Sequence, residues 1–436
     1  MKSAAYVLLL ALAIALSGCG STNNSTQGSN PNAISGLKNR AFVANAIQTS
    51  IGVGGGIQIL DAQHDQFTTF TIQGITAIAP QSITLLPGAL CRTSVNTNPS
   101  NNVCGLGATF SNSNNTIYIF DPTNESNLGN VTLPGDIGNF VISPDARFVY
   151  AASPQLGEVF TIDIVGFTLF PTVNLLGAHH VALSPDGTTL MIVSDNSNVV
   201  TVMNTATRAT YSVADSGNVI DHPVAAFFLD NSDAVVLSCG AECGGTQASV
   251  ASISLTQQQV VNHTNVDGAT AGLLTNGTLF VAGNCVTLPC ANSSNLLLGE
   301  LSILNVTSTG STLSAVMGIN GGYHQSITKV QNSELFVGSI GEPGPGQCAN
   351  PTPTTPPPGF TNPGGCLSIV NPVSHQVTTD TPHGDVTGAA PITGRSVVYV
   401  TEGGQLLIYD TTTMLPFKTT PNIAIAGFLT DVKAAN

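Results

Sequence analysis

Residues 181–187 read VALSPDG, a short apolar run that ends in Ser-Pro-Asp-Gly. The run is typical of a strand, and Pro-Asp-Gly is typical of a tight turn. TLMIVSD follows at 189–195 and VTVMNTAT at 200–207, each rich in β-branched and apolar residues. We therefore predict that the three segments are consecutive strands of one antiparallel sheet, joined by short polar turns.

The same succession of segments recurs along the chain. The copies of the VALSPDG kind are SITLLPG at 82–88, FVISPDA at 140–146, VALSPDG at 181–187, AAFFLDN at 225–231, AGLLTNG at 271–277, SITKVQN at 326–332, GAAPITG at 388–394 and IAGFLTD at 425–431. Units of about four strands repeated in this way indicate an all-β fold, a β-propeller of four-stranded antiparallel blades. A solenoid is the alternative, but its repeats are usually shorter.

The number of copies favours eight blades. Seven blades are the alternative if the irregular region 89–116 is an insertion rather than a strand and its loop. If strands of the VALSPDG kind are innermost, IAGFLTD completes the blade that begins with RAFVAN at 40–45 and closes the ring.

Several segments resemble the blade signatures of the YVTN or lactonase-like β-propeller family, namely FVAN, YIFDPT, MNTAT and LSPDG. The resemblance extends over roughly 40–432. The resemblance implies a propeller fold. It also suggests a lactonase or another hydrolase as one candidate function.

The N-terminus predicts export. Lys2 precedes the apolar stretch Ala4–Leu16, which is too short for a permanent membrane span and fits a secretory signal. Leu16-Ser17-Gly18-Cys19 resembles the lipobox of bacterial lipoproteins, which implies cleavage before Cys19 and lipidation of its sulfur. The alternative is an ordinary signal peptide with a chance cysteine.

These observations predict a domain organisation and a location. We expect a signal peptide at 1–18, a lipidated cysteine with a flexible tether at 19–36, and a single propeller domain at 37–436 with a Pro-rich loop insertion at 341–366. The protein would be exported and lipid-anchored to the bacterial membrane, facing the periplasm or the cell surface. The outer membrane is favoured because residue 20 is Gly rather than Asp.

The charge limits the partners. The chain has 10 Lys and Arg against 24 Asp and Glu, a formal net charge of −14, and no basic cluster. An acidic surface repels nucleic acid and anionic headgroups, so we expect neither as a partner. We expect a monomer that contacts the membrane through its lipid and binds an envelope protein, peptide or glycan.

Eight cysteines besides Cys19 fall into sequential neighbours. The pairs are Cys91/Cys104, Cys239/Cys243, Cys285/Cys290 and Cys348/Cys366. Export favours local disulfides within these pairs. The alternative is metal–thiolate sites at Cys-x3-Cys and Cys-x4-Cys.

The antiparallel order of the strands places the long and cysteine-containing loops on one face. With strands A to D numbered outward from the axis, the B–C loops and the D-to-A crossings share one end of the blades. Three cysteine pairs and the insertion 341–366 lie in B–C loops, and Cys91/Cys104 joins them if TSVN at 93–96 is a B strand.

The crossings also contain histidines and acidic residues. They hold His179, His180, His222, His324 and His383, together with Asp136, Asp221, Asp267 and Asp385. One interpretation is structural, since imidazoles can satisfy backbone groups near the axis. The other is a zinc or copper site formed by these five histidines at the mouth of the central channel.

Two functions follow from these alternatives. The first, which we favour, is a binding or scaffolding module that acts through the disulfide-pinned loop face. The second is a lactonase-like or other metal-assisted hydrolase, with His180, His222, His324 and Asp221 as the candidate catalytic residues. The sequence has no Cys-x-x-Cys-His motif, which argues against covalently attached haem.

Overall fold

The computed structural model describes residues 34–49, 52–76, 78–93, 102–194, 196–287, 290, 298–341, 364–379, 384–416 and 422–435. Ser35–Asn436 form one compact unit. The predicted signal peptide, Cys19 and most of the predicted tether lie outside the described residues, as do Cys348 and His383.

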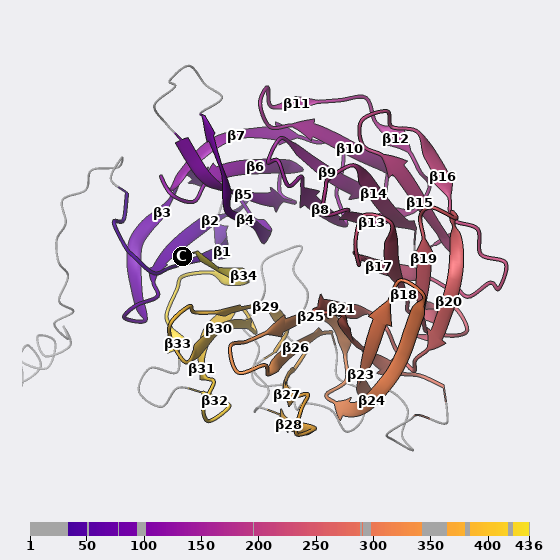
Figure 1. Cartoon of the computed structure of the whole chain (residues 1–436). Coiled ribbons are helices and arrows are strands. Elements are labelled where there is room, and N and C mark those ends of the chain that lie inside the picture. Colours follow the sequence, from indigo (N-terminus) through magenta and orange to yellow (C-terminus); the bar gives the residue numbers. More distant parts are fainter. Residues whose placement is uncertain are drawn as a thin grey trace, which may run out of the picture. The chain divides into compact units, whose positions relative to one another are not determined.

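The described strands form eight four-stranded antiparallel units, which we call blades (Figure 1). Six are separate sheets. The other two, which contain the strands Arg40–Thr49 and Asn102–Ser111, are joined edge to edge by the single residue pair Gln73 and Ser126. This arrangement is the β-propeller that the repeated segments predict, and the number of units matches the favoured eight blades.

Each blade runs outward from an innermost A strand to a D strand (Figure 1). We number the blades in chain order of their B strands, from the first, which contains Arg40–Thr49, to the eighth, which contains Val397–Glu402. The A strands are β4 (Pro80–Thr93), β8 (Asn139–Ile142), β13 (Ala178–Leu183), β17 (Pro223–Phe228), β21 (Ala271–Thr275), β25 (Tyr323–Lys329), β29 (Val386–Pro391) and β34 (Phe428–Ala435). The B strands are β5 (Asn102–Ser111), β9 (Phe148–Ser153), β14 (Thr189–Ser194), β18 (Asp233–Ser238), β22 (Thr278–Cys285), β26 (Leu335–Ile340), β30 (Val397–Glu402) and β1 (Arg40–Thr49).

The C strands are β6 (Thr116–Asp121), β10 (Glu158–Asp163), β15 (Val199–Asn204), β19 (Ser249–Ser254), β23 (Leu298–Thr307), β27 (Leu367–Asn371), β31 (Gln405–Asp410) and β2 (Gly52–Asp61). The D positions are filled by β7 (Ser126–Thr132), β11 (Thr168–Leu169) with β12 (Val173–Asn174), β16 (Thr210–Ser212), β20 (Gln259–Asn265), β24 (Gly310–Ile319), β28 (Gln376–Thr379), β32 (Leu415–Pro416) with β33 (Asn422–Ile423), and β3 (Gln66–Thr76). Among the described residues the only helix is the 3-10 turn η1 (Gly240–Cys243), and no helix is long and apolar enough to cross a membrane.

The C-terminal strand closes the ring, as the position of IAGFLTD predicts. β34 pairs with β1, so the last strand of the chain supplies the A strand of the first blade. Each A strand also contacts the A strands of the two neighbouring blades, and β34 contacts both β29 and β4.

The apolar core is divided among the blade interfaces. Each of the eight clusters of buried apolar residues joins two adjacent blades, and one example contains Met191 and Val193 of β14 with Val236 of β18. B and C strands are therefore buried on both faces, which explains their nearly continuous apolar sequences.

The Ser-Pro-Asp-Gly motif forms the A–B turn of the fourth blade. Ser184 Oγ donates to Asp186 Oδ1 at 2.7 Å and accepts from the backbone nitrogen of Thr189 at 3.0 Å. Gly187 donates to the carbonyl of Ser184 with φ of 75°, a left-handed conformation that glycine adopts without strain. SITLLPG differs, because β4 continues past Pro87-Gly88 to Thr93 with a register shift between Leu86 and Cys91. A bulge of this kind accommodates a proline inside a paired strand.

The predicted position of Cys91/Cys104 is wrong. Strand B of this blade is β5, which starts at Asn102, rather than TSVN at 93–96. Cys91 on β4 pairs in register with Cys104 on β5. These two cysteines therefore belong to the A–B hairpin, at the opposite end of the blade from the B–C loops.

Candidate functional site

A β-bulge recurs at the start of five A strands. The register shifts by one residue between Pro80 and Ser82, Ala178 and His180, Pro223 and Ala225, His324 and Ser326, and Val386 and Gly388. The extra residues are Gln81, His179, Val224, Gln325 and Thr387. A bulge changes the direction in which a side chain points, so these residues leave the simple alternation of the sheet.

A cavity of about 510 Å³ lies where the A strands begin, and three of the bulge residues line it. These three are Gln81, Gln325 and Thr387. Further polar lining comes from Ser82, Thr84, Asn139, Ser326 and Thr430, and aromatic rings come from Phe110, Phe140 and Phe428. Among the described residues, Asp385 is the only charged one in the lining. The described lining therefore offers hydroxyl, amide and aromatic groups to a ligand, and no cation.

Some of these polar side chains have hydrogen-bond partners within the protein and others do not. Asn139 bonds to the backbone of Val181 on the next blade, with its Oδ1 2.7 Å from the nitrogen and its Nδ2 3.2 Å from the carbonyl oxygen. Gln325 Nε2 donates to the carbonyl of Val386, also on the next blade. Within the described part of the chain, the side chains of Gln81 and Ser82 have no such partner, so they can bond to a ligand.

Asp385 anchors the long insertion at the edge of this cavity. Its Oδ1 accepts hydrogen bonds from the backbone nitrogens of Gly341 at 2.9 Å, Gly364 at 2.9 Å and Gly365 at 2.8 Å. The carboxylate is buried, and it joins the residues on either side of the insertion to the crossing that leads into β29. A crossing aspartate is thus a structural clamp in this blade.

Asp221 holds the loop that contains the first disulfide. Its Oδ2 accepts from the backbone nitrogens of Thr246 at 2.5 Å and Gln247 at 3.0 Å, and its Oδ1 lies 2.8 Å from His222 Nδ1. Burial raises the pKa of Asp221, but these hydrogen bonds outweigh burial and hold the pKa well below its usual range. A Cβ at Gly245 would lie 2.1 Å from Asp221 Oδ1, so this close approach requires glycine.

The other histidines have separate surroundings. His180 Nε2 lies 3.4 Å from Asn139 Nδ2, and burial, together with His179, lowers the pKa of His180 to about 4. His324 is buried, its Nε2 lies 2.8 Å from the carbonyl oxygen of Asn320, and burial lowers its pKa to about 4. His180 and His324 are therefore neutral at pH 7.

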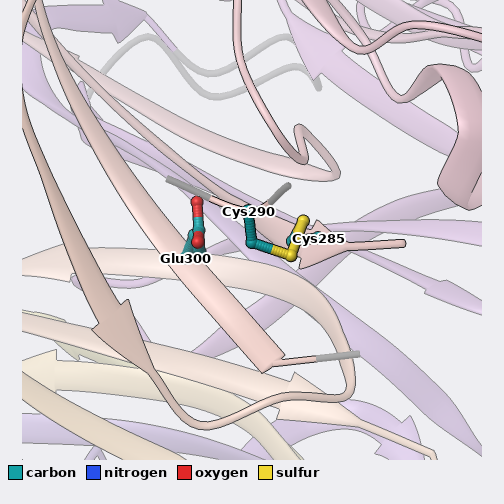
Figure 2. A group of neighbouring side chains, drawn as sticks. All are labelled: Cys285, Cys290 and Glu300. Atoms are coloured by element: carbon teal, nitrogen blue, oxygen red, sulfur yellow. A yellow bond between two sulfur atoms is a disulfide. The ribbon is translucent and has the colours of Figure 1, made fainter. Parts of the chain in front are cut away.

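The structure does not bring the described histidines together around one ion. Among the described residues, the one group of three side chains whose ligand atoms all lie within 4.8 Å of one another is Cys285, Cys290 and Glu300 (Figure 2). Cys285 and Cys290 form a disulfide, so their sulfurs are not thiolates in this state. A zinc or copper site that includes His383, which lies outside the described residues, stays a prediction.

Two of the predicted disulfides are present on the loop face. They are Cys239–Cys243 in the fifth blade and Cys285–Cys290 in the sixth, both between strands B and C. Cys366 is also disulfide-bonded, and its predicted partner Cys348 lies outside the described residues. The disulfides therefore pin neighbouring loops at the end of the blades where the cavity lies.

Apart from Asp385, the sequence pattern did not indicate the residues that line the cavity. Gln81, Gln325 and Thr387 each directly precede one of the A-strand segments, and a polar residue at that position was the available signal. The β-bulge that turns this polar residue into the cavity depends on the pairing of strand A with strand B. The sequence pattern alone therefore did not show where the residue lies.

Solved structures of β-propeller proteins resemble this chain. Hydrazine synthase of Kuenenia stuttgartiensis is 12% identical with a TM-score of 0.52, and the match covers 76% of this chain and 95% of that one. The Cps50 (Swd1) β-propeller domain of Myceliophteria thermophila is 9% identical with a TM-score of 0.50, over 77% and 95% of the two chains. The computationally designed Ika8 protein is 9% identical with a TM-score of 0.52, over 86% and 98%.

At these identities the likeness concerns the fold alone. No protein-family profile matches the sequence, and no curated protein matches it. The order of the strands, the closure by β34 and these structural neighbours together establish that the chain folds as a β-propeller.

Proposed function

We propose that this protein is a binding module of the bacterial cell envelope that takes an uncharged polar ligand, a peptide or a glycan, at its loop face. The observation that carries the proposal is the cavity lined by hydroxyl, amide and phenyl groups, with Gln81, Gln325 and Thr387 presented by β-bulges. Polar groups placed among apolar walls are typical of ligand sites.

The charges support a neutral ligand. Within the part of the chain that the structure describes, Asp385 is the one charged residue that lines the cavity, and its Oδ1 already accepts hydrogen bonds from three backbone nitrogens. A net charge of −14 repels anions. Phe110, Phe140 and Phe428 contribute apolar surface to the lining, which would contact the apolar part of a sugar or peptide.

The cellular setting is part of the proposal. The lipobox-like Leu16-Ser17-Gly18-Cys19 supports a lipid anchor, with the outer membrane favoured and the propeller facing the periplasm or the surface. The blade segments FVAN, YIFDPT, MNTAT and LSPDG support kinship with the YVTN or lactonase-like family. We propose a monomer whose partners are envelope components and not nucleic acid.

The test is binding of the oxidised protein, from residue 20 onward, to arrays of neutral glycans and peptides. We expect Gln81→Ala and Gln325→Ala to weaken a hit by at least about tenfold when combined, since each removes a hydrogen-bonding group. Gln376→Ala is the matched control, because Gln376 is an exposed glutamine on β28 that does not line the cavity. Unchanged binding by the double variant would contradict the cavity as the site.

A hydrolase is the second candidate, and the Asp221–His222 contact is the observation that favours it. A carboxylate 2.8 Å from Nδ1 can orient an imidazole so that its other nitrogen acts as a base. Metal analysis of the exported, oxidised protein, beside a variant with His179, His180, His222, His324 and His383 changed to Ala, tests the metal-assisted form. Stoichiometric zinc or copper that is lost in the variant would favour the hydrolase over the binding module.

A further inference from the structure

A second cavity, of about 430 Å³, lies between the third and fourth blades at the opposite end from the loop face. Its walls include the A–B turns that contain Asp145 and Asp186, and the C–D turn that contains Arg208. Aromatic residues of the third blade, Phe148 and Phe170, form another part of the lining. The central cavity and this one share no lining residue.

The charge of this cavity differs from that of the rest of the molecule. The whole chain has only 10 Lys and Arg, yet two arginines line this one cavity. Arg147 belongs to the third blade and Arg208 to the fourth, so the cationic groups come from both sides of the interface. Asp145 and Asp186 also line the cavity, so its described lining has no net formal charge, whereas the whole chain has a net charge of −14; the two guanidinium groups are its cationic hydrogen-bond donors.

Aromatic rings support both guanidinium groups. The Arg147 guanidinium lies 5.1 Å from the centroid of Phe148, and that of Arg208 lies 4.7 Å from the centroid of Phe170. The two rings contact each other with their centroids 6.1 Å apart. Arg208 Nη1 also donates to the carbonyl of Pro171 at 3.3 Å. An aromatic ring beside the guanidinium restricts the arginine side chain. The N–H groups, which lie in the plane of the guanidinium, stay available to a ligand.

The carboxylates around the cavity have other partners. Asp145 accepts from Ser143 Oγ and the backbone nitrogen of Arg147, and Asp186 accepts from Ser184 Oγ and Thr188. Hydrogen bonds from Ser184 and Thr188 lower the pKa of Asp186. Arg147 Nη2 lies 3.9 Å from Asp163 Oδ2, which is long for an ion pair, and the Arg147 side chain is half exposed. Neither arginine is neutralised by a close carboxylate pair among the described residues.

We propose that this cavity binds a small organic anion that carries an aromatic ring, such as an aryl phosphate or an aryl carboxylate. Arg147 and Arg208 would donate to the oxyanion, since a guanidinium matches the geometry of carboxylate and phosphate. The half-buried rings of Phe148 and Phe170 would contact the aromatic part of the ligand. Because this cavity and the central one are separate, the inference does not depend on the proposed function.

The test is ligand-observed NMR titration of the oxidised protein, from residue 20 onward, with phenyl phosphate and benzoate. Benzamide tests the need for charge, and inorganic phosphate tests the need for the ring. We expect saturable binding of both aryl anions, and at least about fivefold weaker binding to Arg147→Gln and to Arg208→Gln. Arg208→Lys keeps the charge without the planar fork and should fall between wild type and Arg208→Gln.

The controls separate a lost site from a lost fold. Lys38→Gln removes one positive charge from an exposed position outside the cavity and should bind like wild type. The backbone of Arg208 has a positive φ of 60°, a conformation that asparagine tolerates better than most residues. Arg208→Asn is therefore a second neutral variant. All variants should keep the wild-type circular dichroism spectrum. Absence of saturable binding, equal affinity for benzamide and benzoate, or unchanged affinity in folded Arg147→Gln and Arg208→Gln would each overturn the proposal.

Discussion

The Glu242 carboxylate accepts two hydrogen bonds from Asn284, one from its backbone nitrogen at 2.8 Å and one from its Nδ2 at 3.0 Å. Glu242 lies in η1, between strands B and C of the fifth blade, and Asn284 lies on β22 of the sixth. Asn284 Nδ2 also donates to the carbonyl of Gly322, before the A strand of the seventh blade, at 2.9 Å. Three blades are therefore linked on the loop face through one amide side chain.

This link should make stability depend on pH near neutrality. Burial raises the pKa of Glu242 from 4.5 to about 7, although the bonds from Asn284 oppose the increase. Between these two values the folded protein holds a proton that the unfolded chain releases, so stability should fall as the pH rises from about 4.5 to 7 and then level off. We expect Glu242→Gln to remove this slope and to be more stable than wild type at pH 8 by about 1–2 kcal/mol.

Urea unfolding of the oxidised protein at pH 5 and pH 8 measures this effect. Glu158→Gln, which removes a carboxylate from β10 of another blade, is the control and should retain the wild-type pH dependence. Parallel pH profiles for wild type and Glu242→Gln would show that Glu242 does not titrate in this range.

The Asp221 clamp should stabilise the loop that contains Cys239–Cys243. Asp221→Ala leaves the amides of Thr246 and Gln247 without their acceptor, which we expect to cost about 1–3 kcal/mol at pH 7. Because the folded pKa of Asp221 is depressed, its contribution is present above the unfolded value of about 4 and is lost as the pH falls below it. Hydrogen exchange at these two amides, with unfolding at pH 7, checks the prediction. His222→Ala keeps both amide bonds and should have the smaller effect.

The Asp385 clamp should fix both ends of the insertion. Asp385→Ala removes the shared acceptor of the Gly341, Gly364 and Gly365 amides. We expect the free energy of unfolding to fall by about 2–3 kcal/mol. Hydrogen exchange at the three glycine amides should become faster, while exchange in β14 of a distant blade should remain slow. Asp385→Asn retains one acceptor oxygen and should lie between Asp385→Ala and wild type.

A partly buried ion pair should strengthen the closure between the last and first blades. Arg395 Nη2 lies 2.7 Å from Asp65 Oδ2, and the Tyr399 hydroxyl donates to Asp65 Oδ1 at 2.5 Å. The side chains of Arg395 and Asp65 are only 19% and 7% exposed. Asp65→Ala leaves Arg395 without its carboxylate partner, so we expect the free energy of unfolding to fall by about 2–4 kcal/mol.

Tyr399→Phe provides the graded comparison for this closure. It keeps the ion pair and removes one hydrogen bond, so it should cost about 1 kcal/mol. Thermal and urea unfolding of the two variants should rank them in this order. Equal losses in both would mean that the ion pair adds nothing beyond the tyrosine bond.

The repeat pattern was sufficient to predict the propeller, because each strand segment has its own apolar pattern and its own turn residues. The closure by IAGFLTD and the loop disulfides Cys239–Cys243 and Cys285–Cys290 were predicted for the same reason, since they depend on strand order and local spacing. The placement of Cys91 and Cys104 was wrong because the bulge after Leu86 lengthens β4, and a bulge is set by pairing with another strand.

The sequence by itself determined most of the strand segments, their turns and the end of the blades at which the loops with Cys239–Cys243 and Cys285–Cys290 lie, because these follow from alternation and antiparallel order. Only the tertiary structure decided which side chains meet. Asp385 binds the residues beside an insertion in the preceding blade, Glu242 binds Asn284 across an interface, and Arg147 and Arg208 share a cavity between two blades. Such contacts join residues far apart in the chain, and they arise from the packing of one blade against the next.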